Sequence, residues 1–242
     1  MKKINTILAA FSALLMLSVT SANSLEFKAG VSANGMAAYA NAKETLKDSG
    51  RVSNAEAILA TSFASVFAEV SSDEMMGLGI GISYAPEVAD LNKETREIDT
   101  CNDQTSQNTG AACVAKTGTS ADSGTTTVDA KINDLLSLYL TLPVGDTGAY
   151  FKAGYMQATM VTEESLATGS KYEDVDMTGT SLGGGFEGSL GDMAFWRAEG
   201  SYQMWEDISA SGSEAGATTG AKNKITAELG SVTGSLSVGM AF

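Results

Sequence analysis

Seven charged residues fall on one side of the strands that the sequence predicts, opposite the apolar side chains. They are Glu26, Lys28, Glu69, Lys152, Glu187, Arg197 and Glu199. Each lies within a few residues of a predicted short turn or of the first strand's start. Four acids and three bases at one depth would form either a gate on an ion path or a salt-bridged plug. We favour the plug, because buried charges must be paired to offset the cost of their desolvation.

The chain contains no histidine. This removes the usual general base and metal ligand, and it rules out a Ser-His-acid triad. The glycine run at 183–185 is not a phosphate-binding loop, because no Lys-Ser/Thr pair and no predicted helix follow it. We therefore expect a protein that is not an enzyme, with no catalytic residues, no cofactor and no metal site.

The two cysteines, Cys101 and Cys113, fall in the longest predicted loop. An exported chain reaches an oxidising compartment, where two cysteines permit one intramolecular pair. We predict a disulfide that stabilises this loop by about 3 kcal/mol through the closure of a short span. Two free thiols are the alternative.

Eight segments with strand character would position these side chains. They lie near residues 25–39, 56–70, 75–84, 127–142, 149–161, 176–190, 194–205 and 223–242. Three connections are tight turns, at 71–74, 143–148 and 191–192. The others are long and polar, at 40–55, 85–126, 162–175 and 206–222. This alternation predicts an all-β fold, an eight-stranded antiparallel transmembrane β-barrel with short periplasmic turns and four long extracellular loops.

The predicted faces are reversed relative to those of a soluble barrel. In the segment 136–142, four leucines alternate with Ser137, Tyr139 and Thr141. In 196–204, Trp196 and Tyr202 oppose charged and polar residues. An apolar outside and a polar inside fit a barrel surrounded by lipid. They disfavour a soluble lipocalin-like binder.

Three side chains break this alternation. Phe63 and Phe67 fall on the face that should be internal, and Asp134 falls on the outward face. The last segment also changes phase, because the apolar residues at 225–229 have the opposite parity to those at 232–236. A β-bulge near Gly230-Ser231 would place both sets of apolar residues on the same face, since one extra residue shifts the alternation by one position.

Aromatic residues gather near the strand ends, where rings of outer-membrane barrels lie at headgroup depth. Tyr39, Tyr84 and Trp205 are near the long-loop side. Phe151 and Trp196 are near the short-turn side. We predict that these five residues belong to two aromatic girdles.

The final strand carries the strongest resemblance to known proteins. Leu236, Val238, Met240 and Phe242 alternate with small residues up to the terminal aromatic. This pattern resembles the last strand of Gram-negative outer-membrane barrels. The resemblance implies an insertion signal that the barrel-assembly machinery recognises.

The rest of the chain is similar in layout to the small eight-stranded outer-membrane proteins, the family of the OmpA barrel domain, OmpX and the opacity-type surface proteins. Residues 148–155 also resemble a strand of the opacity-type barrels. The family implies roles in envelope structure, adhesion or resistance to external challenge. It also implies contact with outer-membrane lipid and lipopolysaccharide.

The first 22 residues predict a cleaved secretory signal peptide. A basic start at Lys2-Lys3 precedes an apolar run over 7–19 and small residues at 20–22. That run is too short to span a membrane. Residues 23–242 then form one barrel domain, and we expect the protein in the cell outer membrane.

The charge balance narrows the function further. The chain has 15 basic and 29 acidic residues and a net charge of −14. This excludes nucleic acid as a partner, because binding it needs a basic surface. We expect a structural or surface-interaction role through the extracellular loops, with an unknown extracellular partner. A small ion or solute channel is the alternative, and a lipid-modifying enzyme is disfavoured because such enzymes depend on a histidine.

Overall fold

The computed structural model describes residues 25–45, 52–90, 94–99, 123–165, 172–215 and 222–242. The predicted signal peptide and both cysteines lie outside these residues. Among the described residues, no helix is long and apolar enough to cross a membrane.

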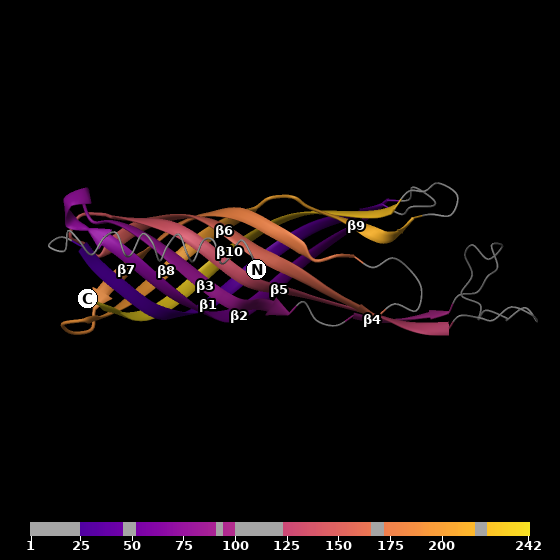
Figure 1. Cartoon of the computed structure of the whole chain (residues 1–242), viewed down its shortest axis with the longest axis horizontal. Helices are drawn as coiled ribbons and strands as arrows, with labels where there is room; N and C mark the ends of the chain where they lie inside the picture. Colours follow the sequence, from indigo (N-terminus) through magenta and orange to yellow (C-terminus); the bar gives the residue numbers. More distant parts are fainter. Residues whose placement is uncertain (1–24, 46–51, 91–93, 100–122, 166–171, 216–221) are drawn as a thin grey trace, which may run out of the picture.

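The described chain is almost entirely β-strand. The elements are β1 (Leu25–Thr45), β2 (Val52–Ser72), the short 3₁₀ helix η2 (Asp73–Met75), β3 (Leu78–Asp90), β4 (Glu94–Asp99), β5 (Ser123–Pro143), β6 (Ala149–Ser165), β7 (Val175–Ser189), β8 (Ala194–Trp205), β9 (Ile208–Ala215) and β10 (Lys222–Ala241). Strands pair in the order β1-β2-β3-β5-β6-β7-β8-β10, and β10 pairs back to β1. The sheet is therefore a closed antiparallel barrel of eight strands, as predicted. Further from the short turns, β4 pairs with β5 beyond the end of β3, and β9 pairs with β10 beyond the end of β8 (Figure 1).

The short turns and the C-terminal end lie together at one end of the barrel (Figure 1). The backbone N–H of Phe242 donates to the carbonyl oxygen of Phe27 at 2.8 Å, and the N–H of Phe27 donates back at 3.2 Å. These bonds fasten the end of the last strand to the start of the first. β4 and β9 lie at the opposite end of the molecule (Figure 1).

The strands run further than the sequence predicted. β1 continues to Thr45, β2 begins at Val52 and β6 continues to Ser165. Parts of the segments 40–55 and 162–175, predicted as loops, are therefore strand. The prediction failed because it sought an apolar outward face, which a strand needs only where its outside contacts lipid.

The last strand shows this change of surroundings directly. β10 pairs with β1 from Ala241 to Lys224 without any shift in register, so the bulge predicted at Gly230-Ser231 is wrong. Its inward face carries Ser237 near the turn end and Leu229 near the far end. We infer that lipid surrounds the part of the strand near the turn end and that water surrounds the part near the far end. The apolar residues therefore point outward near the turn end and inward near the far end, while the strand keeps its regular alternation.

A bulge does occur in β5, at Asp134. The register between β5 and β6 shifts between Asn133 and Leu136, and Asp134 has a φ of 56°. The hydroxyl of Tyr84 donates to the Asp134 carboxylate at 2.5 Å. The bulge explains how Ile132 and Leu135, which are three residues apart, both pack against the same lumenal cluster, because one extra residue resets the alternation.

Among the eight strands that close the barrel, the β2–β3 ladder is the shortest. It covers Val66–Ser72 of β2 and ends just before Pro86, which has no N–H to donate. Beyond that point the Thr61 hydroxyl donates to the Val88 carbonyl at 3.0 Å. A side-chain hydrogen bond therefore links β2 to β3 where the backbone ladder stops.

Tight packing inside the barrel gives a first testable prediction. A Cβ atom at Gly81 would lie 2.3–2.5 Å from the ring of Tyr139. We expect Gly81→Val to lower the free energy of unfolding by about 1–3 kcal/mol, because the aromatic ring must move. Guanidinium unfolding of the refolded protein in lipid vesicles measures this. Gly35→Val is the matched control, since nothing lies within 4 Å of its added Cβ. An equal loss in both variants would contradict the packing argument.

Candidate functional site

The lumen is the candidate site, because it collects polar and charged side chains that the barrel wall holds in fixed positions. Three regions follow one another from the turn end: an ionic layer, a cavity lined by hydroxyl groups and apolar side chains, and an apolar cluster. Each region draws residues from several strands that are distant in sequence.

Arg197 on β8 is the centre of the ionic layer. Its two terminal nitrogens donate to Glu69 on β2 at 2.8 and 2.9 Å, and its Nε donates to Glu187 on β7 at 2.6 Å. Arg197 and Glu69 are each only 3% exposed. A guanidinium matches two carboxylates in this planar geometry, so every charge in the triad has a partner.

The remaining predicted charges extend this layer on both sides. Lys28 lies 2.7 Å from Glu187 and 3.1 Å from Glu26. Across the lumen, Lys152 lies 2.9 Å from Glu199, which also accepts a bond from the Tyr150 hydroxyl at 2.6 Å. The structure thus brings all seven charged residues together at one end of the lumen and pairs each of them.

Aromatic rings surround these charges, and the sequence did not predict this. The Arg197 guanidinium carbon lies 5.3 Å from the centre of the Phe67 ring and 5.1 Å from that of Phe195. Lys152 lies 4.1 Å from the centre of the Tyr139 ring. Such contacts stabilise desolvated cations. The available signal was parity: Phe67 and Tyr139 fall on the inward face, and Phe195 lies two residues from Arg197 on the same face.

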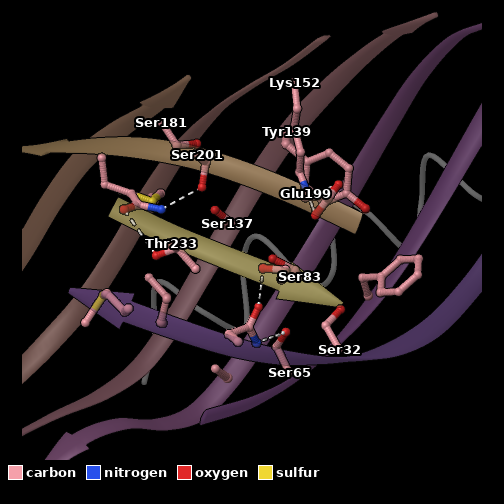
Figure 2. Close-up of a pocket in the computed structure, with 18 of the residues that line it drawn as sticks. Ser32, Ser65, Ser83, Ser137, Tyr139, Lys152, Ser181, Glu199, Ser201 and Thr233 are labelled. Atoms are coloured by element: carbon pink, nitrogen blue, oxygen red, sulfur yellow. Dashed lines mark hydrogen bonds and ion pairs between the residues drawn. The ribbon is translucent and has the colours of Figure 1, made fainter. Parts of the chain in front are cut away.

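Next to the charges, on the side away from the turns, lies a cavity of about 100 Å³ whose lining combines hydroxyl groups with apolar side chains. Serines from seven strands line it, and six of them are labelled in Figure 2: Ser32, Ser65, Ser83, Ser137, Ser181 and Ser201, with Ser235 and Ser237 on β10. Asn34 donates to Ser65 at 3.0 Å and accepts from Ser235 at 2.6 Å. Sequence reasoning noted polar lumenal residues but not that serines gather at one level.

An apolar cluster on β1, β2, β3 and β5 lies in the lumen on the far side of this cavity. Met36, Ala85 and Val88 form a buried cluster against which Phe63 packs. Phe63 therefore lies inside the barrel. It broke the predicted alternation because this part of the lumen is apolar.

Trp205 is a correction to the predicted girdle. It lines the lumenal cavity, and its indole N–H donates to the Ser231 hydroxyl at 3.3 Å. Trp205 has the same parity as Arg197 and Gln203, and this parity directs it inward. The prediction considered only its nearness to a strand end.

The other predicted girdle residues lie on the outside. Tyr39, Phe151 and Trp196 are exposed, and Tyr84 is half-buried against Ile82 and Leu136. The final strand presents its apolar residues outward as well, namely Leu236, Val238, Met240 and Phe242. Among the described residues, no group of three or more Asp, Glu, Cys or His side chains is placed to hold a metal ion.

A closed antiparallel barrel with an apolar exterior and a charged lumen defines a β-barrel of the outer-membrane type. Its fold is similar to that of the outer-membrane protein OprG from Pseudomonas aeruginosa, with a TM-score of 0.47 and 13% identity over 90% of this chain and 96% of that chain. The outer-membrane protease OmpT from Escherichia coli gives a TM-score of 0.46 and 10% identity, covering 90% of this chain and 97% of that one.

Ail, the attachment invasion locus protein of Yersinia pestis, is also similar, in its complex with the heparin analogue sucrose octasulfate. The TM-score is 0.35 and the identity 12%, over 88% of this chain and 99% of that chain. These likenesses concern the fold alone. No protein-family model matches the sequence, and no curated protein matches it.

Proposed function

We propose that this protein is a non-enzymatic outer-membrane barrel with a closed lumen, which serves the envelope or a surface interaction through its extracellular end. The observation that carries the proposal is the ionic layer, in which Arg197 is paired with two carboxylates at once. A fully paired, desolvated layer favours closure over conduction. The apolar cluster around Met36 and Phe63 adds buried side chains to the lumen beyond the cavity.

The proposed partners follow from the exterior and from the resemblance of the last strand. Outer-membrane lipid and lipopolysaccharide would surround the apolar band. The barrel-assembly machinery would recognise the final strand with Val238, Met240 and Phe242. An extracellular partner would contact the part of the chain that lies beyond the aromatic girdle on the long-loop side. A disulfide between Cys101 and Cys113 in that part stays a prediction.

A small channel is the second candidate function. One observation favours it: the charged layer separates two cavities, and Arg197 lines both of them. A movement of the paired side chains could therefore connect the cavities. In this candidate function, the ionic layer is a gate rather than a plug.

Single-channel conductance in a planar bilayer distinguishes the two functions. We expect no conductance steps from the refolded wild type, with folding verified by its heat-dependent gel shift. We expect Arg197→Ala, tested in its folded fraction, to remain silent as well, because the Lys28–Glu187 and Lys152–Glu199 pairs still fill the turn end of the lumen. Stable steps in the wild type that change in Arg197→Ala would reject the plug and establish the channel.

A further inference from the structure

We propose that the barrel lies tilted in the outer membrane, so that lipid covers the exterior of β8, β10, β1 and β2 further from the turns than it covers the exterior of β3, β5, β6 and β7. The inference goes beyond the proposed function, because it concerns the outside of the wall and holds for a closed or an open lumen. It depends on the lengths of the outward apolar runs, on their arrangement around the barrel and on the residues at which they end.

The outward apolar runs are short on four strands, which we call the short side. Counted from the turn end, alternate outward residues are apolar or glycine over 78–84 on β3, 136–142 on β5, 149–155 on β6 and 182–188 on β7. On three of these strands the next outward residue is polar: Asp134 on β5, Gln157 on β6 and Thr180 on β7. β3, β5, β6 and β7 follow one another in the sheet, so they form one half of the wall.

The runs are longer on the other four strands, which we call the long side. They cover 27–39 on β1, 58–70 on β2, 194–204 on β8 and 230–242 on β10. Ser62 is the only polar residue at the outward positions of these runs apart from tyrosine. Large side chains near their far ends are exposed, with Ile58 at 88%. The next outward residues on β2 and β10 are Glu56 and Glu228, which mark the end of the apolar surface.

A level membrane does not match both sides. At about 3.3 Å per residue and a strand tilt of about 40°, the runs reach about 15 Å from the turn end on the short side and about 30 Å on β1 and β2. The apolar band of an outer-membrane barrel is about 25 Å tall. A level band of that height would place Asp134 in hydrocarbon and leave Ile58 in water. A tilt of the whole barrel removes both mismatches, as tilting does for membrane segments that are too long.

Tyrosines end the apolar runs on both sides. Tyr84 and Tyr155 are the last residues of the runs on β3 and β6, and Tyr39 is the last residue of the run on β1. The Tyr39 ring covers Gly230, and its hydroxyl lies 3.3 Å from the Tyr202 hydroxyl. Tyrosine favours the depth of the lipid headgroups, because its ring is apolar and its hydroxyl is polar. The headgroup level therefore passes closer to the turns at Tyr84 and Tyr155 than at Tyr39.

The turn end is consistent with the same direction of tilt. A tilted barrel that has less of its far end in lipid on the short side has more of its turn end in lipid there. Val144 and Leu190 continue the outward runs of β5 and β7 into the turns, and both side chains are exposed. Inner-leaflet lipid would cover them, while the extracellular end inclines toward β1.

Collisions of a spin label with two probes test the tilt. In a Cys101→Ser/Cys113→Ser background, Ala37→Cys on β1 and Gln157→Cys on β6 each carry one nitroxide label. These strands lie on opposite sides of the barrel, since three strands separate them in either direction around the sheet. The refolded protein is placed in dimyristoylphosphatidylcholine vesicles, and folding is verified by the heat-dependent gel shift. The probes are oxygen, which dissolves in lipid, and the neutral nickel complex of ethylenediaminediacetate, which stays in water.

Ala37 lies ten residues from the turn-end start of its run, and Gln157 lies only eight residues from the start of its own. Without a tilt, Gln157 would be at least as deep in lipid as Ala37. With the tilt, we expect the ratio of oxygen to nickel collisions to be at least about tenfold higher at Ala37→Cys, because the polar complex does not enter hydrocarbon. Ala153→Cys, inside the short-side run, should match Ala37→Cys. Lys43→Cys, beyond the long-side run, should match Gln157→Cys.

Three results would overturn the proposal. Equal collision ratios at Ala37→Cys and Gln157→Cys would mean that the barrel lies level. Few collisions with either probe at Ala37→Cys would mean that protein, such as a second copy of the chain, covers the long side instead of lipid. A ratio at Ala153→Cys as low as that at Lys43→Cys would mean that the barrel exterior does not lie in lipid, and this result alone would also reject the proposed outer-membrane role.

Discussion

Replacing Arg197 by alanine is expected to lower the free energy of unfolding by about 3–5 kcal/mol. The substitution leaves the Glu69 and Glu187 carboxylates without the guanidinium that holds both of them. Glu69 is buried, so water cannot replace the lost partner easily. Guanidinium unfolding in lipid vesicles, followed by the gel shift of the folded barrel, measures the loss.

Two further variants make this result specific to the buried triad. Glu26→Gln should cost less than about 1 kcal/mol, because the side chain of Glu26 is 50% exposed and its pair with Lys28 is screened. Arg197→Met combined with Glu69→Gln should lose less than Arg197→Ala, because it removes a charge on each side. A cost below about 1 kcal/mol for Arg197→Ala would show that the layer is not desolvated.

Leu236→Arg is expected to destabilise the barrel in lipid by about 2–4 kcal/mol. Leu236 is 67% exposed on the outward face of β10. It lies six residues from Phe242 and six from Gly230, which pairs with Tyr39. At about 3.3 Å per residue, this places it near the middle of the apolar band. Unfolding titrations in vesicles measure the cost of a charge at that depth.

Val52→Arg is the matched control for lipid depth. Val52 is also apolar and 47% exposed, but it pairs with Thr45 at the far end of β1, well beyond Tyr39. We expect a change within about 0.5 kcal/mol there, as for an ordinary surface position. Equal costs at both positions would mean that the barrel exterior does not lie in lipid.

The half of the barrel nearest the short turns could be predicted well, because its alternation of apolar and polar residues can be read within each strand. Where lipid lies outside, alternate residues face opposite surroundings, so parity alone separates Leu138 and Leu140 from Tyr139. The same counting identified the seven lumenal charges. It was not applied to Trp205, which shares the parity of Arg197 and faces the lumen.

The half of the barrel furthest from the short turns was less predictable, because the outside of a single strand passes from lipid into water along its length. Ile225, Ala227 and Leu229 suggested a bulge, but the register of β10 is continuous. Nothing in a local window separates an added residue from a change of solvent outside the barrel. The bulge at Asp134 in β5 depends on the pairing with β6 and on the bond from Tyr84 of β3.

The sequence by itself determined the number and direction of the barrel strands, the apolar exterior and the set of charged lumenal residues, because each depends on the two-residue period of a single strand. The tertiary structure decided the partners. Arg197 meets Glu69 across 128 positions of sequence, and the serines of seven strands line one cavity. These meetings depend on the register between strands around the closed barrel, which no single segment encodes.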